Sequence, residues 1–199
     1  LDDKDATHLA VPGKLEGTNF TGSLLVGHAT TGTLDVADGN TGVGINALNS
    51  ITSGDKNTVM GFDAGTNITG ATQNTIIGSD AFKGSATDAN SGYNTVIGAY
   101  ALNVASGAAY NTAIGRDAGR GVTTGDRNIL IGYDGGDNIT SGTGNVVIGT
   151  VDADSATGDR QLKIAGNDGS TTTTWISGDS SGNLTFGGTI TIGSATVTE

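Results

Sequence analysis

Residues 94–115 read NTVIGAYALNVASGAAYNTAIG, a stretch that contains two copies of one short pattern. Each copy is an Asn, a Thr, two apolar residues and a Gly, and the copies begin 17 residues apart. Close variants of the pattern recur through most of the chain. They begin at Asn40, Asn57, Asn74, Asn94, Asn111, Asn128 and Asn145. The steps are 17, 17, 20, 17, 17 and 17 residues, and a fixed period of this kind indicates a repeat architecture.

The register extends beyond these seven copies in both directions. Backwards it reaches Ser23-Leu24-Leu25-Val26-Gly27, and forwards it reaches Leu162-Lys163-Ile164-Ala165-Gly166 with the Gly in phase. We therefore expect about nine coils over residues 23–166. Residues 1–22 are interpreted as an extended connector, and residues 167–199 as a small β cap or the start of a further fibre module.

The content of one period predicts an all-β fold. Seventeen residues are too few for a repeat with a helix, but they suit a parallel β-solenoid coil of short strands and Gly-containing turns. Three residues after the Gly comes a small residue, and a further apolar residue then recurs. We assign that second apolar position to Ile51, Ile68, Val104, Val122 and Ile139. Coils stack about 4.8 Å apart, so identical Asn side chains are expected to form an amide ladder.

Two adjacent apolar columns in the strand predict self-association. One runs Val59, Ile76, Val96, Ala113, Leu130, Val147, and the next runs Met60, Ile77, Ile97, Ile114, Ile131, Ile148. Neighbouring side chains of a strand point to opposite faces, so only one column fills the coil interior. The other is expected to pack against copies of the same chain. A parallel homotrimer is the simplest such assembly, with two or four chains left open.

The sequence Asn94-Thr95-Val96-Ile97-Gly98-Ala99-Tyr100-Ala101 resembles the head repeats of trimeric autotransporter adhesins, and resembles still more the repeats of trimeric phage tail fibres. Residues 14–27 and 162–183 also resemble phage fibre segments. The resemblance implies a left-handed parallel β-roll or β-helix, trimerisation and attachment to a host surface. It places the protein outside the cell, on a virion or on a bacterial surface.

Composition excludes several kinds of partner. The chain has 9 basic and 20 acidic residues and a net charge of -11, which disfavours nucleic acid. No apolar run of 18 residues is present, so no membrane insertion is expected. The chain has no Cys and two isolated His residues, so we expect no catalytic site, no cofactor and no metal, and hence no enzyme.

An acidic column is the main candidate for metal binding. It consists of Asp63, Asp80, Asp117 and Asp134, with Asn46 and Tyr100 in other coils. A ladder of cations held by carboxylate oxygens is one interpretation. A solvated acidic stripe is the other, and we favour it because Tyr100 interrupts the column.

The residue before each Asn is the candidate receptor contact. In three successive coils it is Tyr93, Tyr110 and Arg127, which are expected to form a stacked aromatic and cationic patch. The 20-residue step adds a longer loop at residues 83–92, which makes Lys83 a further candidate. Packing between coils is the alternative interpretation of the aromatic row.

These observations predict a structural and adhesive fibre segment. Its expected partners are two copies of itself, other fibre modules end to end, and a host-surface glycan or protein. A bacterial adhesin head, a self-assembling extracellular filament and, least favoured, an enzyme that acts on polysaccharide remain alternatives.

Overall fold

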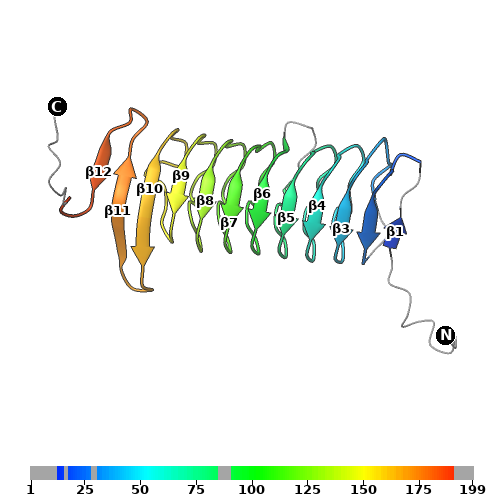
Figure 1. The fold of residues 1–199 in the computed structure, drawn as a ribbon, viewed down its shortest axis with the longest axis horizontal. Helices are drawn as coiled ribbons and strands as arrows, with labels where there is room; N and C mark the ends of the chain where they lie inside the picture. Colours follow the sequence, from blue (N-terminus) through cyan, green and yellow to red (C-terminus); the bar gives the residue numbers. More distant parts are fainter. Residues whose placement is uncertain (1–12, 16–17, 28–30, 85–90, 191–199) are drawn as a thin grey trace.

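The computed structural model describes residues 13–15, 18–27, 31–84 and 91–190. Within these ranges the chain is a parallel β-solenoid built on one 12-stranded sheet, in which the strands follow the order of the sequence. Figure 1 shows the coils stacked side by side along one axis, with the strands on a common side. The all-β solenoid predicted from the repeat is therefore confirmed.

Nine strands form the parallel part of the sheet. They are β2 (Leu24–Val26), β3 (Thr41–Val43), β4 (Thr58–Met60), β5 (Thr75–Ile77), β6 (Thr95–Ile97), β7 (Thr112–Ile114), β8 (Ile129–Ile131), β9 (Val146–Ile148) and β10 (Leu162–Asn167). Each pairs with the next residue for residue, as in Val96 with Ala113. The interval between successive strands is one turn of the solenoid, which gives eight turns.

Antiparallel strands extend the sheet at both ends. β1 (Gly13–Leu15) pairs with β2, and β11 (Thr172–Gly178) pairs with the free edge of β10. β12 (Leu184–Phe186) then pairs with β11. Stacking by backbone hydrogen bonds also reaches residues ahead of the predicted boundary at residue 23, since Ala37 N donates to Asn19 O at 2.9 Å. Thr189 and Ile190 are not in a strand, and the remainder of the predicted last strand lies outside the described residues.

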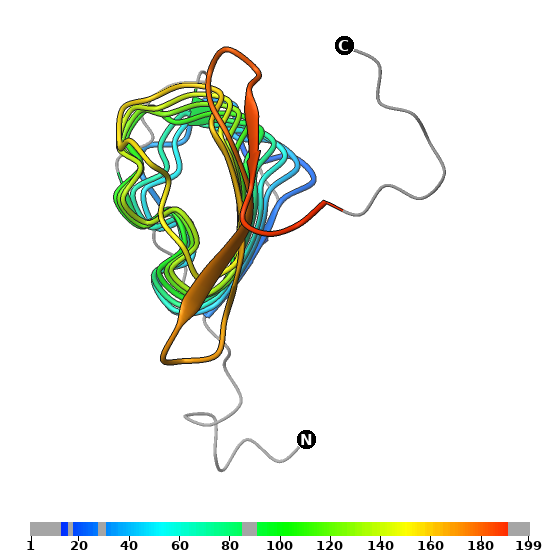
Figure 2. The same ribbon diagram turned by 90° about the vertical axis from the view of Figure 1, so that its left-hand side faces the viewer.

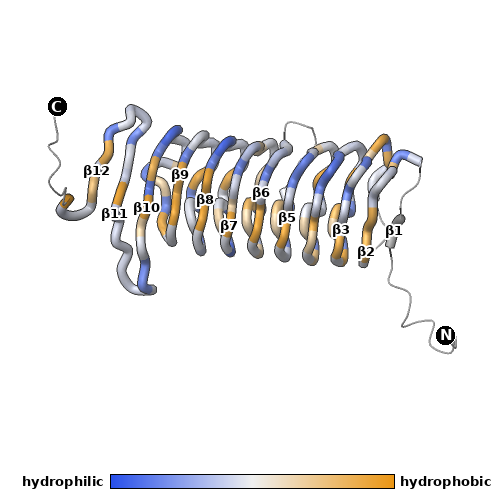
Figure 3. Tube along the Cα trace, viewed as in Figure 1, coloured by the Kyte–Doolittle hydropathy of each residue, from blue (hydrophilic) through white to orange (hydrophobic). Residues whose placement is uncertain are grey.

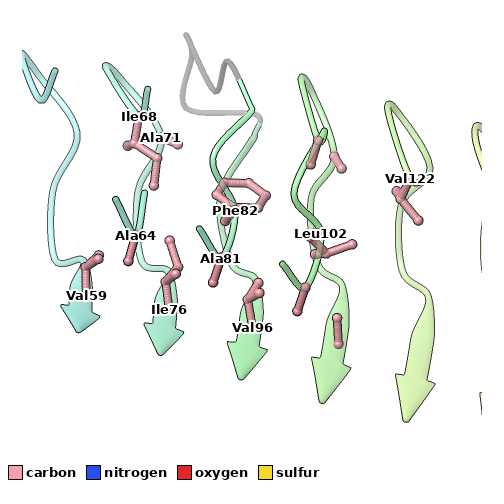
Figure 4. Packing of buried hydrophobic residues seen from close by; sticks show 14 of the residues in the cluster. Val59, Ala64, Ile68, Ala71, Ile76, Ala81, Phe82, Val96, Leu102 and Val122 are labelled. Carbon is pink, nitrogen blue, oxygen red and sulfur yellow. The ribbon is translucent and has the colours of Figure 1, made fainter. Parts of the chain in front are cut away.

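The middle residue of each three-residue strand faces the interior. Val59, Ile76, Val96, Ala113 and Leu130 are at most 1% exposed, whereas the residues on either side of them are partly or largely exposed. Figure 4 shows this column pointing toward Ala64, Ala81 and Ile68 on the returning part of the coil. The inner column of the sequence analysis is thus the core column.

Tight turns between coils depend on residues that tolerate positive φ. Gly115 ends β7 at φ 131°, and a Cβ placed there would lie 2.3 Å from Gly132 O in the next coil. Two residues later Asp117 has φ 58°, and the equivalent Asp63, Asp80 and Asp134 share that conformation. Asn and Asp are enriched in this left-handed region. The turn geometry therefore accounts for the acidic column without invoking a ligand.

The core contains a size alternation that the repeat pattern did not predict. Four residues after the Gly, large Leu48, Phe82 and Leu102 are fully buried, whereas other coils have Gly at the same place. A Cβ added at Gly119 would lie 3.1 Å from Leu102 Cδ2 and 2.4 Å from Leu130 Cδ1. Large side chains of neighbouring coils thus occupy the space that the Gly leaves.

Two predicted registers are wrong by one residue. Val104 is 44% exposed, and fully buried Ala105 occupies the core position, four residues after Ala101 as Ile68 is after Ala64. In the last turn Ile164 pairs with Ile148, so Ala165 aligns with Gly149 and Gly166 lies one residue beyond. That turn is one residue shorter than the others, a change hidden because a Gly still follows.

Candidate functional site

The predicted Asn ladder runs through the solenoid as a buried column. Asn111 Nδ2 donates to Asn94 Oδ1 at 3.3 Å and to Gly125 O at 2.9 Å, while the Asn111 backbone N–H donates to the same Asn94 Oδ1 at 2.9 Å. Asn128 repeats these contacts one coil on, with Asn111 Oδ1 as acceptor. The seven Asn side chains are at most 1% exposed. Because each amide satisfies backbone groups on both sides, the ladder fixes the corner before every strand.

Different residues complete the ladder at its ends, and the repeat pattern did not reveal one of them. Ser23 Oγ accepts the Asn40 N–H at 2.8 Å at the N-terminal end. Gln161 replaces Asn at the C-terminal end, where its Nε2 donates to Asn145 Oδ1 at 3.1 Å. Gln is longer by one methylene but carries the same amide, so chemistry rather than residue identity was the available signal.

The aromatic row has the predicted stacked geometry. The rings of Tyr93 and Tyr110 are parallel within 5°, with centroids 4.9 Å apart. The guanidinium carbon of Arg127 lies 5.0 Å from the centroid of Tyr110, over the ring. Tyr93 and Tyr110 are 45% and 50% exposed. The row is therefore both a cation–π stack between coils and an accessible surface.

Stacking restricts how this row can meet a ligand. Tyr110 has Tyr93 on one face and Arg127 on the other, so both faces of that ring are covered. A sugar ring packs on an aromatic face, and that mode is closed at Tyr110. Only ring edges, the phenolic hydroxyls and the Arg127 side chain, which is 64% exposed, remain for contact.

Lys83 does not join the aromatic row but pairs with the acidic column. Its Nζ lies 2.8 Å from Asp63 Oδ2 and 2.7 Å from Asp80 Oδ1. The hydrogen bond from Lys83, followed by that from Asn46, lowers the pKa of Asp63, and both carboxylates raise the pKa of Lys83. The predicted receptor contact at Lys83 thus has a structural partner, and residues 85–90 of the adjoining loop lie outside the described residues.

Basic side chains also accompany the acidic column farther along. Arg116 Nη1 lies 3.1 Å from Asp117 Oδ2, and Arg120 Nε lies 3.8 Å from Asp117 Oδ1. In the described part of the chain, no group of three or more His, Cys, Asp or Glu residues is arranged to hold a metal ion. The column is therefore interleaved with cationic side chains, a variant of the acidic stripe that the sequence analysis favoured.

The acidic column ends in a small carboxylate cluster. Asp137 stands in the position that Lys83 and Arg120 hold in earlier coils. Burial, a hydrogen bond to Asp152, and the charges of Asp152 and Asp134 raise the pKa of Asp137 to about 6, against the opposing effect of Arg120. The last turns thus hold carboxylates that share a proton at mildly acidic pH.

The outer face of the sheet carries the second apolar column. Met60 is 51% exposed, and Ile77, Ile97, Ile114 and Ile148 are 36–37% exposed. Figure 3 shows the apolar colour running along the strands from coil to coil. No charged residue occupies the first or third position of strands β2 to β9. This charge-free aliphatic face is the most extended surface feature of the solenoid.

Comparisons with known proteins find no match: no family model, no curated protein and no solved structure resembles this chain. Among the residues that the structure describes, none belongs to a helix long and apolar enough to cross a membrane.

Proposed function

We propose that this chain is a structural and adhesive segment of an extracellular fibre, assembled as a parallel homotrimer. The observation that carries the proposal is the charge-free aliphatic outer face of the sheet. Exposed apolar surfaces that extend this far are typical of interaction surfaces. A cyclic assembly brings the same column from each copy to one axis, where it is removed from water.

The architecture supports a load-bearing role. Every coil is tied to the next by the parallel ladder of backbone bonds and by the buried Asn column, so the solenoid is a continuous rod without a hinge in its described coils. The resemblance of the repeat to phage tail fibres favours a virion fibre, with a bacterial surface adhesin head as the related alternative. We assign no reaction to the chain.

Self-association is tested by molecular mass. Multi-angle light scattering at micromolar concentration is expected to give three times the mass of one 19.6 kDa chain. Ile114→Asp is expected to lower that mass, because it places a charge in the uncharged interface. Thr112→Asp changes a residue on the same face two positions earlier and is expected to have a smaller effect. A single-chain mass for the unmodified protein rejects the homotrimer.

The adhesive contact is proposed at the outer edge of the aromatic row. The core occupies the inner face of the strands and the assembly occupies the outer face, so ligands are left with the turns. Tyr and Arg contribute much of the energy at many interfaces, and three copies add avidity. The triple change Tyr93→Ser, Tyr110→Ser and Arg127→Ser is expected to weaken adsorption to host cells. Unchanged adsorption by an intact trimer identifies this segment as a spacer.

A further inference from the structure

The outer face can be divided into three columns that change differently along the solenoid. We name them the first-position column and third-position column of each strand, and the exit column, which is the residue after the Gly that ends the strand. The third-position column remains apolar throughout. Through the paired strands it continues from Ile148 to Ile164, Ile176 and Phe186.

The first-position column becomes apolar only toward the C-terminal end. From β3 to β7 it consists of Thr41, Thr58, Thr75, Thr95 and Thr112. From β8 onward the register gives Ile129, Val146, Leu162, Gly178 and Leu184. Ile129 and Leu184 are 41% and 55% exposed. Leu24 in β2, next to the antiparallel β1, departs from this trend.

The exit column shows the opposite change. Ile45 and Phe62 follow β3 and β4 and are 57% and 52% exposed. In later coils the same place holds polar or paired side chains: Arg116 Nη1 donates to the Tyr133 hydroxyl at 3.1 Å, and the Arg116 guanidinium lies over the Tyr133 ring. Apolar side chains therefore occupy opposite margins of the outer face at its two ends.

Twist of the solenoid gives a physical reason for this shift. In the end view of Figure 2 the successive coils are turned slightly relative to one another. Sheets twist because of backbone sterics. A straight symmetry axis beside a twisted stack faces a different part of each coil along its length. Residues at one repeat position then contact the axis in some coils and solvent in others.

We infer that copies of this chain associate through an oblique band on the outer face. It begins at Ile45 and Phe62, follows the third-position column, and ends at Ile129, Val146, Leu162, Leu184 and Phe186. This inference rests on the proposed self-association. It adds that equivalent repeat positions contribute unequally, and that strands β10 to β12 belong to the interface.

A second copy of the chain is the occupant that fits this band. Side chains recur on it at the strand spacing of about 4.8 Å, and an identical solenoid presents ridges at the same spacing. The absence of charge in the columns of β2 to β9 lets two chains of net charge -11 approach through that face. From β2 to β12 the face is roughly 50 by 10 Å. A pair then buries about 1,000 Å², the lower range of specific interfaces.

Cysteine cross-linking tests the inference, because the unmodified chain has no Cys. Phe62→Cys and Ile129→Cys lie inside the band. Tyr133→Cys and Thr58→Cys lie at the equivalent repeat positions outside it. Under mild oxidation the two variants inside the band are expected to form covalent dimers at least fivefold faster than their matched controls. Thermal unfolding of each reduced variant verifies that it is folded.

A second set of variants measures association directly. Phe62→Ser and Ile129→Ser are expected to raise the dissociation constant at least tenfold in sedimentation, against less than threefold for Tyr133→Ser and Thr58→Ser. If the unmodified chain associates but the matched pairs cross-link and dissociate alike, the oblique band is wrong while self-association stands. If the unmodified chain is a monomer, both the proposed homotrimer and the band are rejected.

Discussion

Removing one amide from the buried ladder is expected to cost far more than removing an exposed one. Asn111→Ala removes both Nδ2 donations, to Asn94 Oδ1 and Gly125 O, and the Oδ1 that accepts two bonds from Asn128. Asn94 Oδ1 keeps the Asn111 N–H, and Asn128 Nδ2 keeps Gly142 O. Two buried backbone groups, Gly125 O and the Asn128 N–H, lose these partners.

The magnitude follows from those two groups. A buried polar group that loses its partner costs about 1–3 kcal/mol. A water molecule that enters the vacated space recovers part of that cost. We therefore expect Asn111→Ala to lower the free energy of unfolding by about 2–4 kcal/mol. Asn67→Ala is the matched control, because exposed Asn67 makes one bond, from its Nδ2 to Lys83 O at 2.7 Å. We expect less than about 1 kcal/mol there.

The assay is urea unfolding followed by circular dichroism, at one fixed protein concentration because association stabilises the folded chain. Comparable losses for Asn111→Ala and Asn67→Ala refute the view that the ladder holds the coils together. A loss at Asn111 with an unchanged denaturant slope supports it.

Three further perturbations follow from the same structure. Gly115→Ala is expected to destabilise the chain by more than about 3 kcal/mol in urea unfolding, because positive φ and the contact with Gly132 O both oppose a Cβ; a near-neutral effect contradicts the turn geometry. Asp137→Asn is expected to raise the free energy of unfolding by on the order of 1–2 kcal/mol at pH 7. Folding raises the pKa of this carboxyl to about 6, so the native state binds the extra proton and stability falls as pH rises from about 4 to 6. The advantage of the Asn variant should therefore vanish near pH 4, and an advantage that persists there points to a cause other than titration. Adding excess calcium or a chelator is expected to shift the midpoint of thermal unfolding by less than about 10 °C, since a tightly bound structural cation would contribute several kcal/mol.

The sequence revealed features that one period repeats and missed features that depend on neighbouring coils. The core column, the Asn ladder and the Tyr93–Tyr110 stack follow from a fixed spacing, because coils in register place equal positions above one another. Ala105 was missed because the neighbouring Val104 is the stronger apolar signal within the same period. The packing of Leu102 over Gly119 requires knowledge of contacts between coils, and spacing carries no such information.

Variation along a column separates residues that the fold requires from residues that are free to serve an interaction. The Asn corner, the Gly after each strand and the core column change little, because each is fixed by hydrogen bonds, positive φ or burial. The first-position and exit columns are exposed in every coil and are under none of these constraints. Even so, they do not vary at random: the first becomes aliphatic where the exit column turns polar. Two columns that change in opposite directions along a twisted stack are the pattern expected when a straight second surface lies against it. The position of the apolar side chains, rather than their number, is therefore the feature of this solenoid that argues most directly for assembly.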